Sequence, residues 1–161
     1  MAKLTEKVYG EALFELAVEE GREKELLHEV LTIRKVLDEN PDFAKLMKNP
    51  AIPESEKEEV LKTVWDGRIS KEITGLMLLL LQKEHYGEVT KVLGYFAACI
   101  KEEQKIGVAY VSTALPITEE QRKSVEKRLL DTTAYKSFEM HYETNPALIG
   151  GIVIRIGDRV V

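Results

Sequence analysis

The segment Ile106-Gly-Val-Ala-Tyr-Val-Ser-Thr-Ala114 divides the chain into two parts with different hydrophobic periodicity. Before it, as far as Gln104, apolar residues recur at every third or fourth position, the spacing of helices packed around a core. From Ile106 onward, apolar and polar residues alternate in short runs, which is typical of strands with one solvated face. The pattern therefore predicts a mainly α protein, with a helical N-terminal domain over residues 1–105 and a small α/β domain over residues 106–161.

The composition is that of a globular protein with a core, because 44% of the 161 residues are hydrophobic and 32% are charged. The chain has one cysteine, Cys99, so it forms no internal disulfide. The first residues lack the apolar centre of a secretion signal. No apolar run approaches the ~18 residues that a membrane-spanning helix needs. These features predict a protein of a reducing, cytoplasmic setting that does not cross a membrane.

The negative charge is confined to the first part of the chain. Of the charged residues, 16 basic and 21 acidic ones precede Ile106, and 7 of each follow, which places the whole net charge of -5 before that residue. A dedicated nucleic-acid-binding protein needs a basic surface to neutralise phosphates. The charge distribution argues against that class.

Capping residues and breakers divide the first part into six helices, a compact bundle. Thr5, Ser55 and Ser70 are suited to begin the first, fourth and fifth of them, because their hydroxyls can accept from free backbone amides. The fifth helix carries Leu76-Met-Leu-Leu-Leu-Leu81, which is apolar on every side. Such a helix is expected in the centre of a bundle.

For the second part of the chain, the sequence predicts a strand, a helix and a hairpin. Ile106 opens the first strand, and a capping box from Thr118 to Gln121 begins an amphipathic helix. A strand follows around Phe138, and the segment Ile149–Ile156 is predicted to be a strand interrupted by two glycines. A tight turn then leads into a last strand. Because the chain stops inside that strand, the sequence predicts an α/β domain whose C-terminal end is truncated.

No residue pattern predicts catalysis, a metal or a cofactor. The histidines His28, His85 and His141 fall on different elements, and none has a second ligand at the spacing of a zinc site. Cys99 has no basic neighbour that would activate its thiol. The pair Gly150-Gly151 is followed by a strand, whereas phosphate-binding loops lead into a helix. The sequence therefore favours a non-enzymatic adaptor without cofactors.

Small residues on the first helix are consistent with either of two arrangements. Ala12 and Ala17 lie on or beside its apolar stripe. They allow a partner helix to dock closely, or they allow tight packing within the bundle itself. The sequence alone leaves both open.

Two motifs resemble a known family. The stretch Leu148-Ile-Gly-Gly-Ile-Val-Ile-Arg-Ile-Gly-Asp-Arg-Val-Val161 is similar to the C-terminal signature of the ATP synthase delta subunits, the bacterial counterparts of the mitochondrial oligomycin-sensitivity-conferring protein. The stretch Tyr9-Gly-Glu-Ala-Leu-Phe-Glu-Leu-Ala17 resembles the family's opening helix. The residues that carry the first match are Gly150, Gly151, Arg155, Gly157 and Asp158.

The resemblance implies a non-catalytic stator subunit of a rotary, proton-translocating ATP synthase. In the family the bundle's first and fifth helices form a groove for the N-terminal helix of an alpha subunit, while the C-terminal domain meets the b subunits of the peripheral stalk. Such a protein lies peripherally at the cytoplasmic face of the bacterial cell membrane, held there through the complex. Carried onto this chain, the groove residues are Tyr9, Ala12, Leu13, Leu16, Leu76 and Leu80.

One departure and one alternative accompany this hypothesis. The family continues beyond the Gly-Asp turn with a polar segment and a final helix, which puts attachment to the b subunits in question for a chain that ends at Val161. The alternative is a helical scaffold carrying a ferredoxin-like nucleic-acid-binding module. It is disfavoured because its strands lack basic residues interleaved with aromatic ones, and Tyr110 alone makes no stacking platform.

Overall fold

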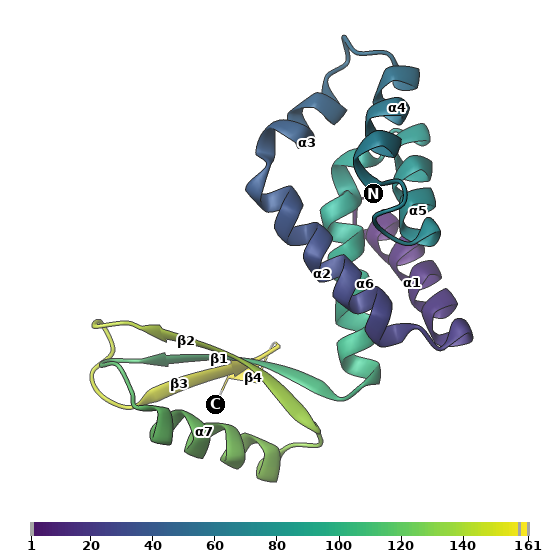
Figure 1. Ribbon diagram of the computed structural model, residues 1–161. Coiled ribbons are helices and arrows are strands. Elements are labelled where there is room, and N and C mark those ends of the chain that lie inside the picture. The colour runs from purple at the N-terminus through teal and green to yellow at the C-terminus, as the bar shows by residue number, and fades with distance from the viewer. Residues whose placement is uncertain (1, 158, 161) are drawn as a thin grey trace. The chain divides into compact units, whose positions relative to one another are not determined.

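The computed structural model describes residues 2–157 and 159–160, and the chain forms two compact units, Met1–Ile100 and Lys101–Val161. The first unit runs from purple to teal in Figure 1, and the second from green to yellow. The division falls within a helix, a few residues before the boundary predicted after residue 105. The predicted fold class, a helical bundle followed by a small α/β unit, is confirmed.

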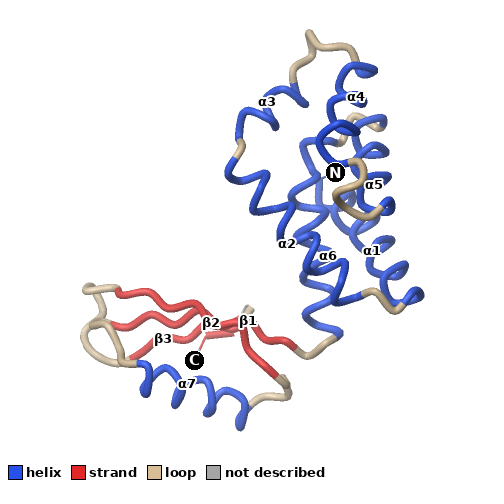
Figure 2. Tube along the Cα trace, viewed as in Figure 1, coloured by secondary structure: helices blue, strands red, loops and turns tan. Residues whose placement is uncertain are grey.

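The first unit is built from helices with short connections, as Figure 2 shows in blue. Their bounds are α1 (Ala2–Glu20), α2 (Glu23–Glu39), α3 (Pro41–Lys48), α4 (Glu54–Trp65), α5 (Lys71–Gln82), the single turn η1 (Tyr86–Glu88) and α6 (Val89–Glu103). Glycine and proline act as predicted at the breaks. Gly21 has φ +65 directly after α1, and Pro41 opens α3 at its first position.

The predicted N-caps of the first unit are wrong in detail. α1 already begins at Ala2, so Thr5 lies inside the helix, where it is buried. α4 begins directly after Pro53, whose extended backbone starts the helix before Ser55 can cap it. Ser70 does precede α5, but its side chain makes no capping bond; instead its backbone N–H donates to a carboxylate oxygen of Glu29 on α2 over 2.6 Å. Contacts between helices thus replace local capping.

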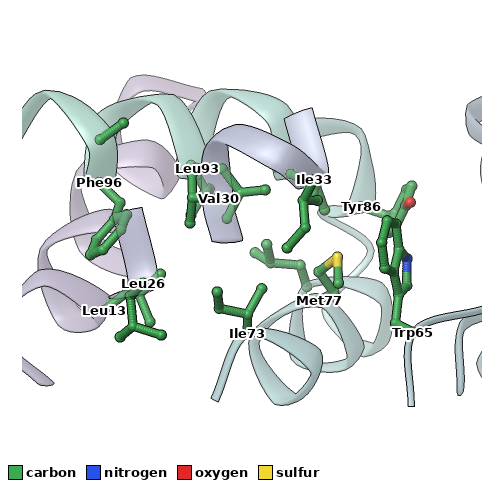
Figure 3. Close-up of a cluster of buried hydrophobic side chains, with 14 of the residues drawn as sticks. Leu13, Leu26, Val30, Ile33, Trp65, Ile73, Met77, Tyr86, Leu93 and Phe96 are labelled. Atoms are coloured by element: carbon green, nitrogen blue, oxygen red, sulfur yellow. The ribbon is translucent and has the colours of Figure 1, made fainter. Parts of the chain in front are cut away.

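The core of the first unit lies where the helices meet, and Figure 3 shows part of it. α5 contributes Ile73, Met77 and Leu80, each at most 1% exposed, and α6 contributes Phe96. The expectation that the leucine-rich run is buried on every side is wrong for Leu79, which is 38% exposed. α5 therefore has one face open to solvent.

The second unit is a four-stranded sheet with one helix. Its elements are β1 (Ile106–Thr113), α7 (Glu119–Thr132), β2 (Ser137–Thr144), β3 (Ile152–Ile156) and β4 (Arg159–Val160), in the spatial order β2-β1-β3-β4. β1 pairs parallel with β2 and antiparallel with β3. β2 and β3, although consecutive, are therefore not neighbours; the predicted tight hairpin is β3–β4.

Local signals in the second unit are largely confirmed. The Thr118 hydroxyl accepts from the Gln121 amide, and the Gln121 side chain accepts from the Thr118 amide, which is the predicted capping box. Gly150 and Gly151 have φ +69 and +76, so the strand begins only after them, at Ile152. α7 packs Leu129 against Ala109 and Phe138 on one face of the sheet.

Candidate functional site

The outward side of α1 carries apolar side chains in a row. Leu4 is 60% exposed and Val8 is 52% exposed, and the exposed Ala12 and half-buried Leu16 continue the same spacing of four residues. Residues four apart lie on one face of a helix. The inward side of α1 buries Leu13 and Ala17 instead. α1 therefore presents an apolar row beside the stripe that forms the core.

α5 continues this apolar surface. The Arg22 guanidinium, just beyond the C-terminal end of α1, donates to Glu72 in the first turn of α5 over 2.9 Å, and the two helices lie in contact side by side (Figure 1). Leu76 and Leu79 stand four and seven residues after Glu72, so they face the same way as Glu72. Leu76 is half-buried and Leu79 is exposed.

We call this surface the α1–α5 strip. Its members are the exposed or half-buried apolar residues on the adjoining sides of the two helices, Leu4, Val8, Ala12, Leu16, Leu76 and Leu79. Exposed apolar side chains that cluster, as opposed to single ones, mark contact sites for other proteins. The side chains offer apolar contact and no reactive group.

The structure separates the predicted groove residues into two sets. Ala12, Leu16 and Leu76 belong to the α1–α5 strip, and Tyr9 packs half-buried at its border. Leu13 and Leu80 do not belong to it, because they are 4% and 1% exposed and lie inside the core, where Figure 3 labels Leu13. Their side chains therefore contribute to the core and not to the exposed surface of the strip.

Leu4, Val8 and Leu79 are the strip residues that sequence reasoning missed. Leu4 precedes the predicted cap at Thr5, but α1 begins at Ala2 and so includes Leu4. The row of apolar positions at 4, 8, 12 and 16 was the available signal. That row lies beside the buried row, and periodicity alone does not say which of two adjoining rows faces the core.

Charged groups fix the end of the strip. Arg22 is bonded to Glu20 and Glu25 as well as to Glu72, with distances of 3.0, 3.2 and 2.9 Å. A hydrogen bond from its own backbone, together with the bond from Arg22, holds the pKa of the Glu72 carboxyl below its usual value, against the effect of desolvation. The cluster keeps the start of α5 beside the end of α1.

Within residues 2–157 and 159–160, no three metal-ligating side chains gather in one place. Burial raises the pKa of the Cys99 thiol. Burial also raises the pKa of the Tyr86 hydroxyl. That tyrosine borders a depression of about 470 Å³ between η1 and the loop after α3, lined mainly by lysine, glutamate and apolar side chains.

The signature residues lie in and beside β3. Gly150 and Gly151 precede the strand, Arg155 is exposed within it, and Gly157 has φ +60 in the turn to β4. Positive φ at these positions favours glycine. Asp158 lies outside the described residues. The Arg155 guanidinium stacks on the Tyr110 ring, 4.9 Å from its centre.

No helix in the described part of the chain is long and apolar enough to span a membrane. The fold defines a class of two-unit, mainly helical proteins, in which a bundle with an exposed apolar strip precedes a four-stranded α/β unit. The family model for "ATP synthase delta (OSCP) subunit" matches residues 5–161. The chain belongs to this family of ATP synthase subunits, which confirms the resemblance seen in the two motifs.

Individual relatives agree with the family match. The chain is 39% identical to the ATP synthase subunit delta of Lachnoclostridium phytofermentans over 100% of its own length and 88% of the relative's. It is 26% identical to that of Alkaliphilus oremlandii, over 100% and 89% of the two chains. A chain in the cryo-EM structure of the Toxoplasma gondii mitochondrial ATP synthase hexamer has the same fold, with a TM-score of 0.80 at 17% identity, covering 97% of this chain and 88% of that one.

Proposed function

We propose that the chain is a non-catalytic stator subunit of a bacterial, proton-translocating ATP synthase. It links the catalytic head to the peripheral stalk, so that the head does not turn with the rotor and rotor torque drives ATP synthesis. Membership of the delta family over residues 5–161 supports this role over that of a nucleic-acid-binding module. On this proposal the protein lies at the cytoplasmic face of the membrane, peripherally, through its partners.

The observation that carries the proposal is the α1–α5 strip. An amphipathic helix binds by laying its apolar face on an apolar surface, with contacts spaced by three and four residues. The strip offers such a surface over two adjoining helices, with the small side chain of Ala12 between Val8 and Leu16. A small side chain lets the backbone of a docked helix approach closely. We propose the N-terminal helix of an alpha subunit as the partner of the strip.

The second unit is the proposed partner of the b subunits. A stator must hold its partners against torque, so it needs two separate attachment surfaces and no chemistry of its own. A two-unit chain with an apolar strip on the first unit leaves the second unit for the other attachment. When a partner covers an exposed apolar strip of this kind, each Å² of apolar area removed from water adds roughly 25 cal/mol to the favourable free energy of binding, before the costs of association are subtracted.

Coupling measurements test the proposal. Membranes that carry the ATP synthase without this chain should hydrolyse ATP but pump few protons, because the head is not held against the rotor. Adding the purified full chain should restore ATP-driven proton transport, followed by the quenching of a pH-sensitive dye. Proton transport that is equally fast with and without the chain would contradict a stator role.

A further inference from the structure

The start of α5 is capped by a residue of another helix. Ser70 precedes α5 with an extended backbone, and its N–H donates to a carboxylate oxygen of Glu29 on α2 over 2.6 Å. In a capping box, this N–H donates instead to a glutamate or glutamine at the third residue of the helix itself. In α5 the third residue is Ile73, which is fully buried in the core. Glu29 therefore supplies from α2 the acceptor that this position of α5 does not.

A second polar contact joins the same end of α5 to the end of α1. The backbone N–H of Arg22 donates to the Ala17 carbonyl over 2.8 Å, across Gly21 with its φ of +65. This is the bond of a Schellman motif, which closes the C-terminal end of a helix. The guanidinium of the same arginine donates to Glu72 in the first turn of α5 over 2.9 Å. Arg22 is thus bonded to α1 through its backbone and to α5 through its side chain.

The two contacts come from one side of α2. Arg22 directly precedes α2, and Glu29 stands seven residues later, which is about two helical turns and therefore the same side. Both contacts are partly withdrawn from water, because Glu29 is half-buried and the side chains of Arg22 and Glu72 are 24% and 28% exposed. Hydrogen bonds that involve a charged group are stronger than neutral ones, and partial burial strengthens them further. We call these two contacts the α5 clamp.

The α5 clamp fixes what apolar packing alone leaves adjustable. α5 is otherwise held by its buried side chains, Ile73, Met77 and Leu80 among them. Apolar contact is not directional, whereas a hydrogen bond sets both a distance and an angle. Leu76 and Leu79 of the α1–α5 strip lie on the same short helix. A displacement of the start of α5 therefore moves them relative to the strip residues of α1.

We propose that Glu29 and Arg22 are positioning residues for the docked helix, although neither belongs to the α1–α5 strip. The inference rests on the proposed function, because it takes the strip to bind the N-terminal helix of an alpha subunit. It adds that a glutamate of a third helix, α2, sets the spacing of the two helices that receive it. Without this contact, the start of α5 leaves its place beside α1 for part of the time. The apparent affinity then falls in proportion to the fraction of chains that present the strip in its binding form.

Calorimetric titration of the full chain with a peptide that copies the N-terminal helix of the alpha subunit tests the inference. Glu29→Ala should weaken binding at least about fivefold, which corresponds to about a fifth of the chains in the binding form. Glu29→Gln keeps a side-chain oxygen that accepts from the Ser70 N–H, so it should bind within about twofold of the wild type. Glu39→Ala removes an exposed glutamate at the other end of α2 and should bind like the wild type.

Hydrogen exchange of the free chain provides a second measurement. The backbone amides in the first turn of α5 should exchange faster in Glu29→Ala than in the wild type, because that turn opens more often without its cap. Glu29→Gln should restore the slow exchange. The binding and exchange measurements together separate positioning from a purely structural role, since a purely structural contact would change exchange without changing the affinity of the folded chain.

The outcomes also separate the inference from the function on which it rests. A wild type that does not bind the peptide contradicts both. Wild-type binding that Glu29→Ala leaves within about twofold overturns the positioning role, while the stator role stands. Equal weakening by Glu29→Ala and Glu29→Gln also overturns it, because the acceptor oxygen would then not be what matters. If Glu29→Ala does not fold, as judged by circular dichroism, Arg22→Ala decides by the same criterion, because it removes the other contact of the α5 clamp.

Discussion

Gly10 of α1 lies directly against Tyr95 of α6. A Cβ atom placed on Gly10 would be 2.7 Å from Cδ1 and 3.0 Å from Cβ of Tyr95, closer than real Cβ atoms come to their neighbours. The Tyr95 hydroxyl also donates to the Glu11 carboxylate over 3.2 Å, which fixes the ring in this position. Close contact of the two helices therefore requires glycine at this position, and α1 is held in the bundle by its inner side.

Gly10→Ala should destabilise the first unit by about 1–3 kcal/mol, because the added methyl group forces α1 away from Tyr95. The single tryptophan, Trp65, is buried in this unit, so its fluorescence follows urea unfolding of the bundle. Gly75→Ala is the matched control. Nothing lies within 4 Å of the corresponding Cβ, so alanine should stabilise α5 by up to about 1 kcal/mol. Equal stability of the two variants would contradict the close helix contact.

Val8→Asp should weaken binding of the alpha-subunit helix at least about tenfold without lowering the stability of the bundle, since Val8 is exposed on the α1–α5 strip. Val18→Asp is the control, because Val18 is 43% exposed on the same helix but outside the strip. Ala12→Arg should act like Val8→Asp, since a long charged side chain covers the middle of the strip. If Val18→Asp weakened binding as much as Val8→Asp, the docking surface would lie elsewhere on α1.

Thr118→Ala should destabilise α7 by about 1 kcal/mol, because the hydroxyl that accepts from the Gln121 backbone amide is lost. Hydrogen exchange of the α7 amides measures the effect within the second unit. Ser55 was predicted to cap α4 but does not, because the helix begins directly after Pro53. Ser55→Ala should therefore change the stability of the bundle by less than about 0.5 kcal/mol. A larger loss for Ser55→Ala would mean that the serine does cap α4.

The stability of the second unit should fall in acid partly through Glu139. Burial alone would raise the pKa of this carboxyl, but the bonds and charges of Lys101 and His141 outweigh it and hold the pKa below the usual 4.5. A carboxyl whose pKa is lower in the folded than in the unfolded state stabilises the fold at pH values above its unfolded-state pKa. This contribution is lost as the pH falls below about 4.5. Urea unfolding followed by amide NMR signals of the sheet should therefore show a smaller acid loss for Glu139→Gln than for the wild type. Glu103→Gln changes an exposed residue and should leave the loss of stability in acid the same as in the wild type.

Much of the fold follows from local patterns in the sequence. The change of periodicity at Ile106 and the breaks at Gly21 and Pro41 each have a local physical cause, and each predicted the right element. The capping box at Thr118 did so as well. The placement of β1 between β2 and β3 could not be predicted in this way, because strand order depends on packing against α7 and not on the turn between consecutive strands.

The candidate site was less predictable than the fold. Leu13 and Val8 are both apolar residues of α1, yet one is in the core and the other is exposed. The difference depends on where α5 and α6 contact α1, which is tertiary information. The contact of Tyr110 with His141 and Arg155 was not predicted for the same reason, since these residues lie far apart in sequence and meet only through strand pairing.

Titration of the full chain with a peptide that copies the N-terminal helix of the alpha subunit tests the central claim most directly. Fluorescence anisotropy of the labelled peptide should rise to a plateau that corresponds to one peptide per chain, with Val8→Asp shifting the midpoint and Val18→Asp leaving it in place. No rise in anisotropy at tens of micromolar chain, or a rise that Val8→Asp and Val18→Asp affect equally, would contradict the claim that the α1–α5 strip ties this chain to the catalytic head.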